Sequence, residues 1–311
     1  MSACASASEP DYCNFVLANP DISGIGVRVA VYVQVGLNVL ASALFESNLQ
    51  LTRDAARTSY VLSFSLVLAS IIQWKLDGMG LFDALVSTQL ATLMTVFMLF
   101  NIRYISSLGL SINISSALFL AFYTYWGIQT WTFPPCPSNH LTRFVLFGKS
   151  IPATNPHLRT FALVVFGFVG VLSVCAVGWV VGWVYRVWVH GGEVRARSAV
   201  VWDRSRRERY GIGAYRLRSL TPLPILIYLV ITTEQLVATN KQQPESDLSN
   251  LDQWTYGQTL AVVMLLAQLV ELGLWVVRER KVGRELEWRG KSRSKSRRGD
   301  VDVGLPVSVF R

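Results

Sequence analysis

Charged side chains are scarce in this chain. Of its 311 residues, 16% are Asp, Glu, Lys or Arg, whereas 51% are hydrophobic; a soluble domain of this size carries about a quarter charged residues. The apolar residues gather in stretches long enough to cross a bilayer, which takes about 20 residues. The composition therefore argues against an ordinary soluble domain. It predicts an all-α, polytopic transmembrane helical bundle whose main partner is the lipid bilayer.

Metal and nucleotide motifs are also lacking. The three histidines have no H-x-x-x-H spacing and the four cysteines no C-x-x-C spacing, so no zinc or haem site is predicted. There is no D-D-x-x-D cluster, Walker loop, G-x-S-x-G or dinucleotide fingerprint. We therefore expect no metal and no cofactor. The net charge of +9 does not predict nucleic-acid binding, because the basic residues lie in loops and in the tail, between the apolar stretches.

Seven spans are predicted, at 23–45, 59–74, 81–100, 108–131, 161–185, 223–240 and 257–277. Residues 1–22 contain no Lys or Arg and no apolar core, so we expect an N-terminal tail rather than a cleavable signal peptide. The domain organisation is then a tail at 1–22, a seven-helix domain at 23–277 and a basic tail at 278–311. The sixth span is the weakest, but it starts beside two prolines, which are tolerated in a first helical turn.

Basic residues are distributed unevenly around these spans. With the N-terminus outside, the inner segments hold 23 Lys and Arg and the outer segments hold five. Short cytosolic loops collect such residues, so the pattern predicts an outside N-terminus and a cytosolic C-terminus. The location follows as the endoplasmic reticulum or another membrane of the secretory pathway or cell surface. For the tail sequence RGKSRSKSRRGD, the alternatives are binding to anionic lipid, switching by serine phosphorylation, a retention signal, or a solvated tail that only enforces this topology.

The outer side of the predicted map holds three cysteines and a proline-rich loop. Oxidising compartments permit disulfides, and a bridge between Cys13 and Cys136 is preferred, with free thiols as the alternative. The loop at 132–158 carries five of the 11 prolines and cannot be helical throughout. It is either a lid over an outer cavity or a rigid linker.

Ionisable residues inside the spans are the main pointers to function, because such residues are costly in lipid. They are Arg28, Asp83, Glu234 and Glu271. The first three are expected in the outer half of the membrane. We expect further polar and aromatic side chains to accompany them, namely Gln34, Asn38, Gln129, Gln258, Tyr123, Tyr125 and Trp126.

Two interpretations of these residues remain open. Arg28, Gln34 and Asn38 share one face of a helix, which predicts a polar stripe directed into the bundle. The stripe either lines a pocket that opens outward or forms interhelical contacts, with Arg28 paired to Glu234 or Asp83. A carboxyl group in apolar surroundings serves as a general acid, and aromatic faces stabilise cations. Asp83 or Glu234 would then start the cyclisation or isomerisation of a hydrophobic, terpenoid-like small molecule.

A family resemblance points the same way. The segments NPDISGIGVRVAVYVQ, PATNPHLRTFAL and WTYGQTLAVVMLLAQLVEL resemble recurrent pieces of fungal multi-pass integral membrane proteins. Most of those proteins have no assigned activity, and some are similar to membrane proteins of indole-diterpene and other secondary-metabolite clusters. The resemblance implies a membrane-bound terpene cyclase and no particular catalytic residue. A transporter or receptor-like seven-helix protein and a non-catalytic membrane scaffold are the alternatives.

Overall fold

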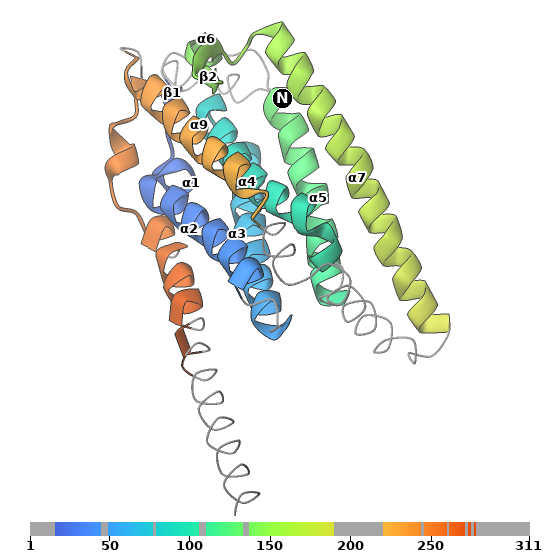
Figure 1. Ribbon diagram of the computed structural model, residues 1–311. Helices are drawn as coiled ribbons and strands as arrows, with labels where there is room; N and C mark the ends of the chain where they lie inside the picture. The colour runs from blue at the N-terminus through green and yellow to red at the C-terminus, as the bar shows by residue number, and fades with distance from the viewer. Residues whose placement is uncertain are drawn as a thin grey trace, which may run out of the picture. The chain divides into compact units, whose positions relative to one another are not determined.

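The computed structural model (Figure 1) describes residues 16–44, 49–76, 79–105, 110–132, 137–189, 220–243, 246–259, 261–270, 273–274 and 277. Four features predicted from the sequence lie outside these ranges: Cys13, Cys136, Glu271 and the basic tail. The chain divides into two compact units, Met1–Leu265 and Leu266–Arg311. In the second unit, residues 266–270 are helical. The architecture below is that of the first unit.

Helices dominate the first unit. They are α1 (Pro20–Ser23), α2 (Ile25–Leu44), α3 (Leu49–Leu76), α4 (Leu81–Ile105), α5 (Leu110–Trp131), α6 (Pro137–Leu141), α7 (Pro156–Val189), α9 (Leu223–Lys241) and the short 3-10 helix η3 (Ser249–Asp252). The strands are β1 (Val16–Leu17), β2 (Arg143–Leu146), β3 (Lys149–Pro152) and β4 (Ser246–Asp247). β1 pairs with β4 in parallel, and β2 pairs with β3 as an antiparallel hairpin.

Five stretches of the described helices are long and apolar enough to cross a membrane: Pro20–Ala41, Arg57–Leu76, Leu81–Asn101, Pro156–Tyr185 and Leu223–Lys241. They coincide with five of the seven predicted spans. The predicted fourth span is the 22-residue helix α5, which is not among those five. The predicted seventh is described in part, as the apolar helix Ala261–Val270. The chain therefore has the make-up of a multi-pass membrane protein, and the count of seven stays a prediction.

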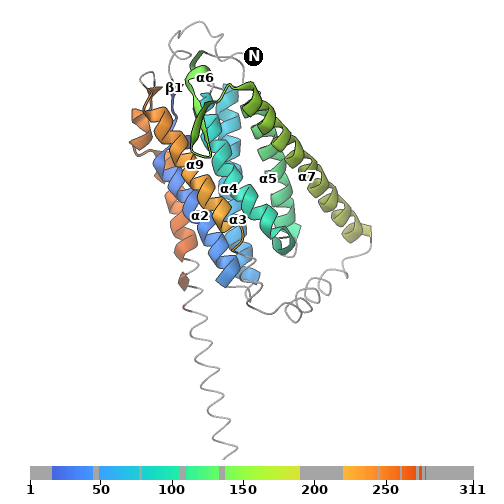
Figure 2. The same cartoon turned by 45° about the horizontal axis from the view of Figure 1, so that its top comes forward.

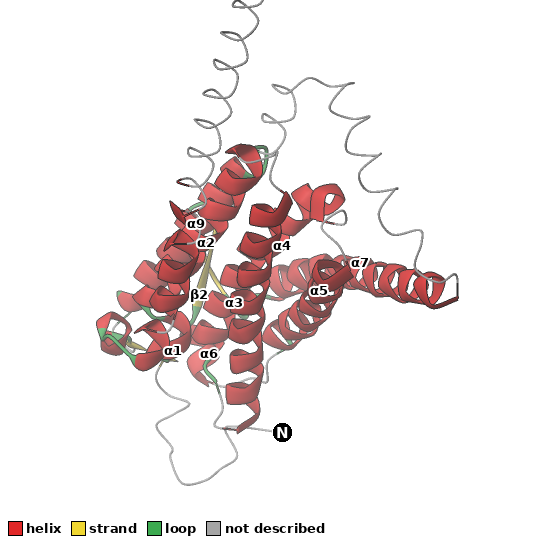
Figure 3. Cartoon of the chain, turned by 90° about the horizontal axis from the view of Figure 1, so that it is seen from below, coloured by secondary structure: helices red, strands yellow, loops and turns green. Residues whose placement is uncertain are grey.

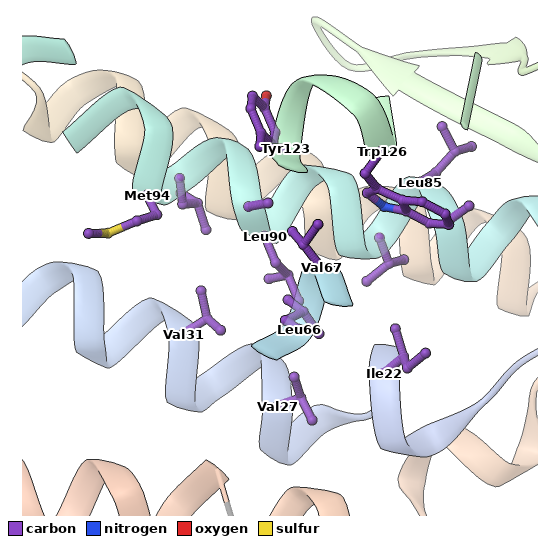
Figure 4. Close-up of a cluster of buried hydrophobic side chains, with 14 of the residues drawn as sticks. Ile22, Val27, Val31, Leu66, Val67, Leu85, Leu90, Met94, Tyr123 and Trp126 are labelled. Atoms are coloured by element: carbon purple, nitrogen blue, oxygen red, sulfur yellow. The ribbon is translucent and has the colours of Figure 1, made fainter. Parts of the chain in front are cut away.

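Helix α4 is the centre of the bundle. It contacts α2, α3, α5 and α9, and 83% of its most apolar 18-residue stretch is buried. A helix that is apolar all round, as α4 is, belongs in such an interior position. Figure 4 shows the resulting core, in which Leu85, Leu90 and Met94 of α4 meet side chains of the neighbouring helices.

Helix α7 lies at the edge of the bundle beside α5 (Figure 3), and only 22% of its most apolar 18-residue stretch is buried. Its close contact with α5 depends on Gly127, because a Cβ at this position would collide with the Phe166 ring. The same ring packs on Tyr123 at 5.3 Å between centroids. Small residues bring helix backbones together in this way in membrane proteins. Cys175 is exposed on α7.

The proline-rich loop at 132–158 folds into α6 and the β2–β3 hairpin. The hairpin packs on α9 and runs alongside it from the α6 end of the bundle (Figure 2). At its base, Asn240 of α9 accepts a hydrogen bond from the Arg143 N–H at 2.8 Å and donates one to the Arg143 carbonyl at 2.7 Å. A side chain of α9 thus fixes the hairpin to the bundle. The lid and the rigid linker both stay predictions.

Candidate functional site

An ion pair joins the first and sixth predicted spans. The Arg28 Nη1 atom of α2 lies 2.5 Å from the Glu234 Oε2 atom of α9, and the Tyr32 hydroxyl donates to Glu234 Oε1 at 2.8 Å. Arg28 and Tyr32 are one helical turn apart, so both face α9. The predicted pairing of Arg28 with Glu234 is present in the structure. Their burial differs greatly, however: the Arg28 side chain is 4% exposed and the Glu234 side chain 49% exposed.

Asp83 occupies a different place and has different partners. It lies in the first turn of α4, is 3% exposed, and accepts hydrogen bonds on both oxygens. The donors are the Ser23 hydroxyl, at 2.6 Å, and the Asn19 N–H, at 2.9 Å. Both donors belong to the short turn that contains α1. Asp83 therefore fastens this turn to α4, and among the described residues it forms no ion pair with Arg28.

Gln258 fastens the same turn to the start of the last predicted span. Its side chain is fully buried, accepts from the Gly26 N–H at 3.0 Å and donates to the carbonyls of Pro20 and Gln253. Next to it, Asp21 accepts from the Gly257 N–H at 3.1 Å. A Cβ at Gly24 or Gly26 would collide with Gln258, so these two glycines permit the contact. We call this set of contacts the α1 latch, comprising residues 19–26, Asp83, Gly257 and Gln258.

The other two amides of the predicted stripe meet α3. Gln34 and Asn38 are each 2% exposed, and both donate to the Ser59 hydroxyl, at 2.7 and 2.5 Å. Their carbonyl oxygens are buried and accept no hydrogen bond. The stripe faces the bundle as predicted, but it serves two separate contacts, Arg28 with α9 and the amides with α3.

The three predicted pocket aromatics do not gather in one place. Trp126 donates to the Ser87 hydroxyl at 3.0 Å, and the Tyr123 hydroxyl lies 2.9 Å from that of Thr92, so both rings face α4. Tyr125 is 40% exposed. It lies on another side of α5, because two positions along a helix turn the side chain by about 200° relative to Tyr123. Gln129 of the same helix is half-buried, with no side-chain hydrogen bond among those described.

The chain matches no family model, no curated protein and no solved structure. The site is therefore interpreted from its own geometry. Most of the polar residues predicted inside the spans are distributed over three separate contacts: the Arg28–Tyr32–Glu234 cluster, the α1 latch and the Gln34–Asn38–Ser59 contact. Of the two candidate catalytic carboxyls, Glu234 has a surface that a substrate can reach, whereas Asp83 is enclosed.

Several partners in these contacts were not predicted. Tyr32 carries a signal in hindsight, because it lies one turn from Arg28 on the stripe. Ser23, Ser59 and Asn240 carry none, since serine and asparagine are common in loops and at helix ends. In the described part of the chain, no group of three or more His, Cys, Asp or Glu side chains is placed to hold a metal ion.

Proposed function

We propose that this chain is an integral membrane protein of seven spans that isomerises or cyclises a lipophilic, terpenoid-like molecule by proton transfer at Glu234. The observation that supports this proposal is the exposure of Glu234 within an apolar helix. Half of its side chain is open, while Arg28 and Tyr32 hold its two oxygens. An ionisable side chain inside a membrane helix is costly and marks a functional site by default. The sequence resemblance to membrane proteins of secondary metabolism agrees with this substrate class.

The surroundings of Glu234 suit an apolar substrate. Helical periodicity places Ile227 and Ile231 on the same face of α9 as Glu234, and these side chains are 51% and 50% exposed. On α2, Val29 and Val33 flank Tyr32 and are 45% and 37% exposed. A hydrocarbon skeleton resting on these side chains brings a reactive double bond next to the carboxyl group.

The reaction then balances without a co-reactant. Glu234 first takes up a proton from water and then transfers it to an alkene carbon, whose π electrons form the new C–H bond and leave a carbocation. A second π bond attacks this cation and closes a ring, or the cation rearranges. Loss of a proton from a neighbouring carbon back to Glu234 forms the final double bond. Arg28 and Tyr32 hold the carboxylate that exists between the two transfers, as preorganised donors do in other active sites.

The test is the lipid-soluble metabolite profile of a host with and without the chain. Glu234→Asp keeps a negative charge beside Arg28 but draws the carboxyl group back by one methylene. We expect normal amounts of protein and a product loss of about 100-fold or more, the size of a general acid–base contribution. Gln235→Ala, at the exposed neighbour on α9, is the matched control and should retain the product. Unchanged product formation by Glu234→Asp would remove Glu234 from the reaction.

A non-catalytic membrane scaffold is the second candidate. It is supported by the α1 latch, in which Asp83 and Gln258 serve only contacts within the bundle. A scaffold predicts that Glu234 variants change the amount of folded protein and that the host's metabolites are the same with and without the chain. The two proposals therefore differ in one measurement.

A further inference from the structure

The β2–β3 hairpin reaches into the membrane-spanning part of the bundle. Its base is held by Asn240, next to the end of α9, and its tip meets Tyr228, twelve residues earlier on the same helix. A four-residue strand rises roughly 13 Å. Helix α9 has 19 residues, which is roughly 28 Å and close to the ~30 Å thickness of a hydrocarbon core. If α9 spans the membrane, the hairpin tip lies roughly 13 Å below the surface.

The tip of the hairpin contains a strained residue, Phe147, which contacts α9. Phe147 has φ 49° and Gly148 has φ 73°, which together make a two-residue turn in the left-handed region. Glycine adopts this conformation freely, but a bulky residue adopts it only where the surroundings hold it there. Here the Phe147 ring stacks on Tyr228 at 5.4 Å, and the Phe147 N–H donates to the Tyr228 hydroxyl at 3.1 Å. The contact with α9 thus positions the tip.

Lipid is a poor environment for this hairpin. One edge of the sheet faces α9, whereas β3 is an outer edge, and its residues Lys149 and Ser150 are exposed. Irregular or edge backbone at membrane depth is tolerated only where protein covers it or water reaches it, because unpaired peptide groups are costly in hydrocarbon. A lysine in mid-membrane is costly as well. Exposed peptide groups and an exposed ammonium at this depth both require water.

We propose that the hairpin lines a water-filled vestibule that enters the membrane domain from the side holding the 132–158 loop. The two exposed cations of the hairpin, Arg143 at its base and Lys149 beside its tip, favour small anions over small cations in this water. The vestibule adjoins the face of α9 that carries Tyr228. Glu234 lies about 120° from Tyr228 around the helix, on another face, so this inference does not depend on the proposed reaction.

Cysteine labelling in sealed cells or vesicles tests the proposal. Ser150→Cys is introduced into a chain whose four native cysteines are replaced by alanine. The lipid-side control is Val171→Cys on α7, and the water-side control is Gln253→Cys; these positions are apolar and polar, respectively, and both are exposed. We expect a charged, membrane-impermeant methanethiosulfonate reagent to modify the cysteines at 150 and 253 and to leave the one at 171 unmodified.

Charge selectivity gives a second readout. At each position we measure the rate of modification by an anionic reagent relative to that by a cationic one. This ratio should be roughly threefold higher at position 150 than at position 253, as expected for one unit charge nearby in water. Lys149→Gln should bring the two ratios towards equality. Equal ratios before that change would overturn the anion preference.

Two outcomes would overturn the vestibule itself. Reaction at position 150 only with a lipid-soluble maleimide would place the hairpin in lipid, and disulfide-linked dimers through this position would mean that a second copy covers it. If the cysteine-free chain does not fold, hydrogen exchange of the unmodified chain in nanodiscs decides the question. The peptide that includes residues 147–151 should then exchange within seconds, whereas protection for hours would contradict the proposal.

Discussion

Removing Glu234 is expected to cost more stability than removing Arg28, although the two side chains form one ion pair. Glu234→Ala leaves a guanidinium that is 4% exposed without its counter-ion, and an uncompensated buried charge costs about 3 to 5 kcal/mol. Arg28→Ala leaves a carboxylate that is 49% exposed and still bonded to Tyr32. The carboxylate thus keeps a hydrogen-bond donor in Tyr32, so we expect a smaller loss of about 1 to 2 kcal/mol.

The double variant completes the test. With both charges removed, no unpaired charge remains, so the loss should fall short of the sum of the single losses by about 1 to 3 kcal/mol. The measurement is reversible unfolding of the purified chain in mixed micelles over a range of denaturing detergent. Additive single losses, within about 0.5 kcal/mol, would show that the pair contributes nothing. Equal single losses would refute the argument from burial.

Further predictions concern the latch, the helix packing, the topology and the thiols. Asp83→Asn replaces one accepting oxygen of the α1 latch by a donor, so one hydrogen bond to the charged group is lost. Thermal unfolding should show that the free energy of unfolding falls by about 1.5 to 3 kcal/mol for each such bond. Gly127→Leu should overpack the α5–α7 contact and lower the free energy of unfolding by about 1 to 3 kcal/mol, and Phe166→Ala should restore part of this loss. Full stability of the single variant would contradict that packing. Reporters on the two ends of the chain should respond on opposite sides of the membrane, the C-terminal one in the cytosol, and both on one side would exclude seven spans. Mass spectrometry without reduction should recover a Cys13–Cys136 peptide pair, and finding both as free thiols would remove the disulfide.

Helix positions could be predicted because one strong physical signal determines them. A helix in lipid needs about 20 apolar residues, and that length marks α2, α4 and α7 in the sequence. The predicted fifth span began five residues after Pro156, where α7 starts, because the first turn contains His157 and Arg159. Hydropathy penalises such residues, whereas a helix end tolerates them. The Arg159 Nε atom in fact donates to the Trp131 carbonyl at the end of α5.

The site could be predicted only in part, for a geometric reason. Periodicity shows which residues of one helix share a face, and this correctly directed Arg28, Gln34 and Asn38 into the bundle. It gives no information on which helix faces them. Arg28, Asp83 and Glu234 were therefore expected to lie together because of their similar depth, although depth alone does not bring side chains together. The β2–β3 hairpin was missed because Phe147 occupies a turn position where Asn or Gly is the usual signal.

The α1 latch also sets an order of assembly during synthesis. Gly26 and Gln258 are separated by 232 residues, so at about 5 to 20 residues per second the first span waits roughly 10 to 50 s for its partner. During that time, the Gly26 N–H and one face of the turn lack the contacts that later cover them. The finished bundle thus closes by joining its earliest and latest helices. A nascent chain stalled before residue 258 would be recognisable to quality-control factors by the surface of this turn that Gln258 has not yet covered.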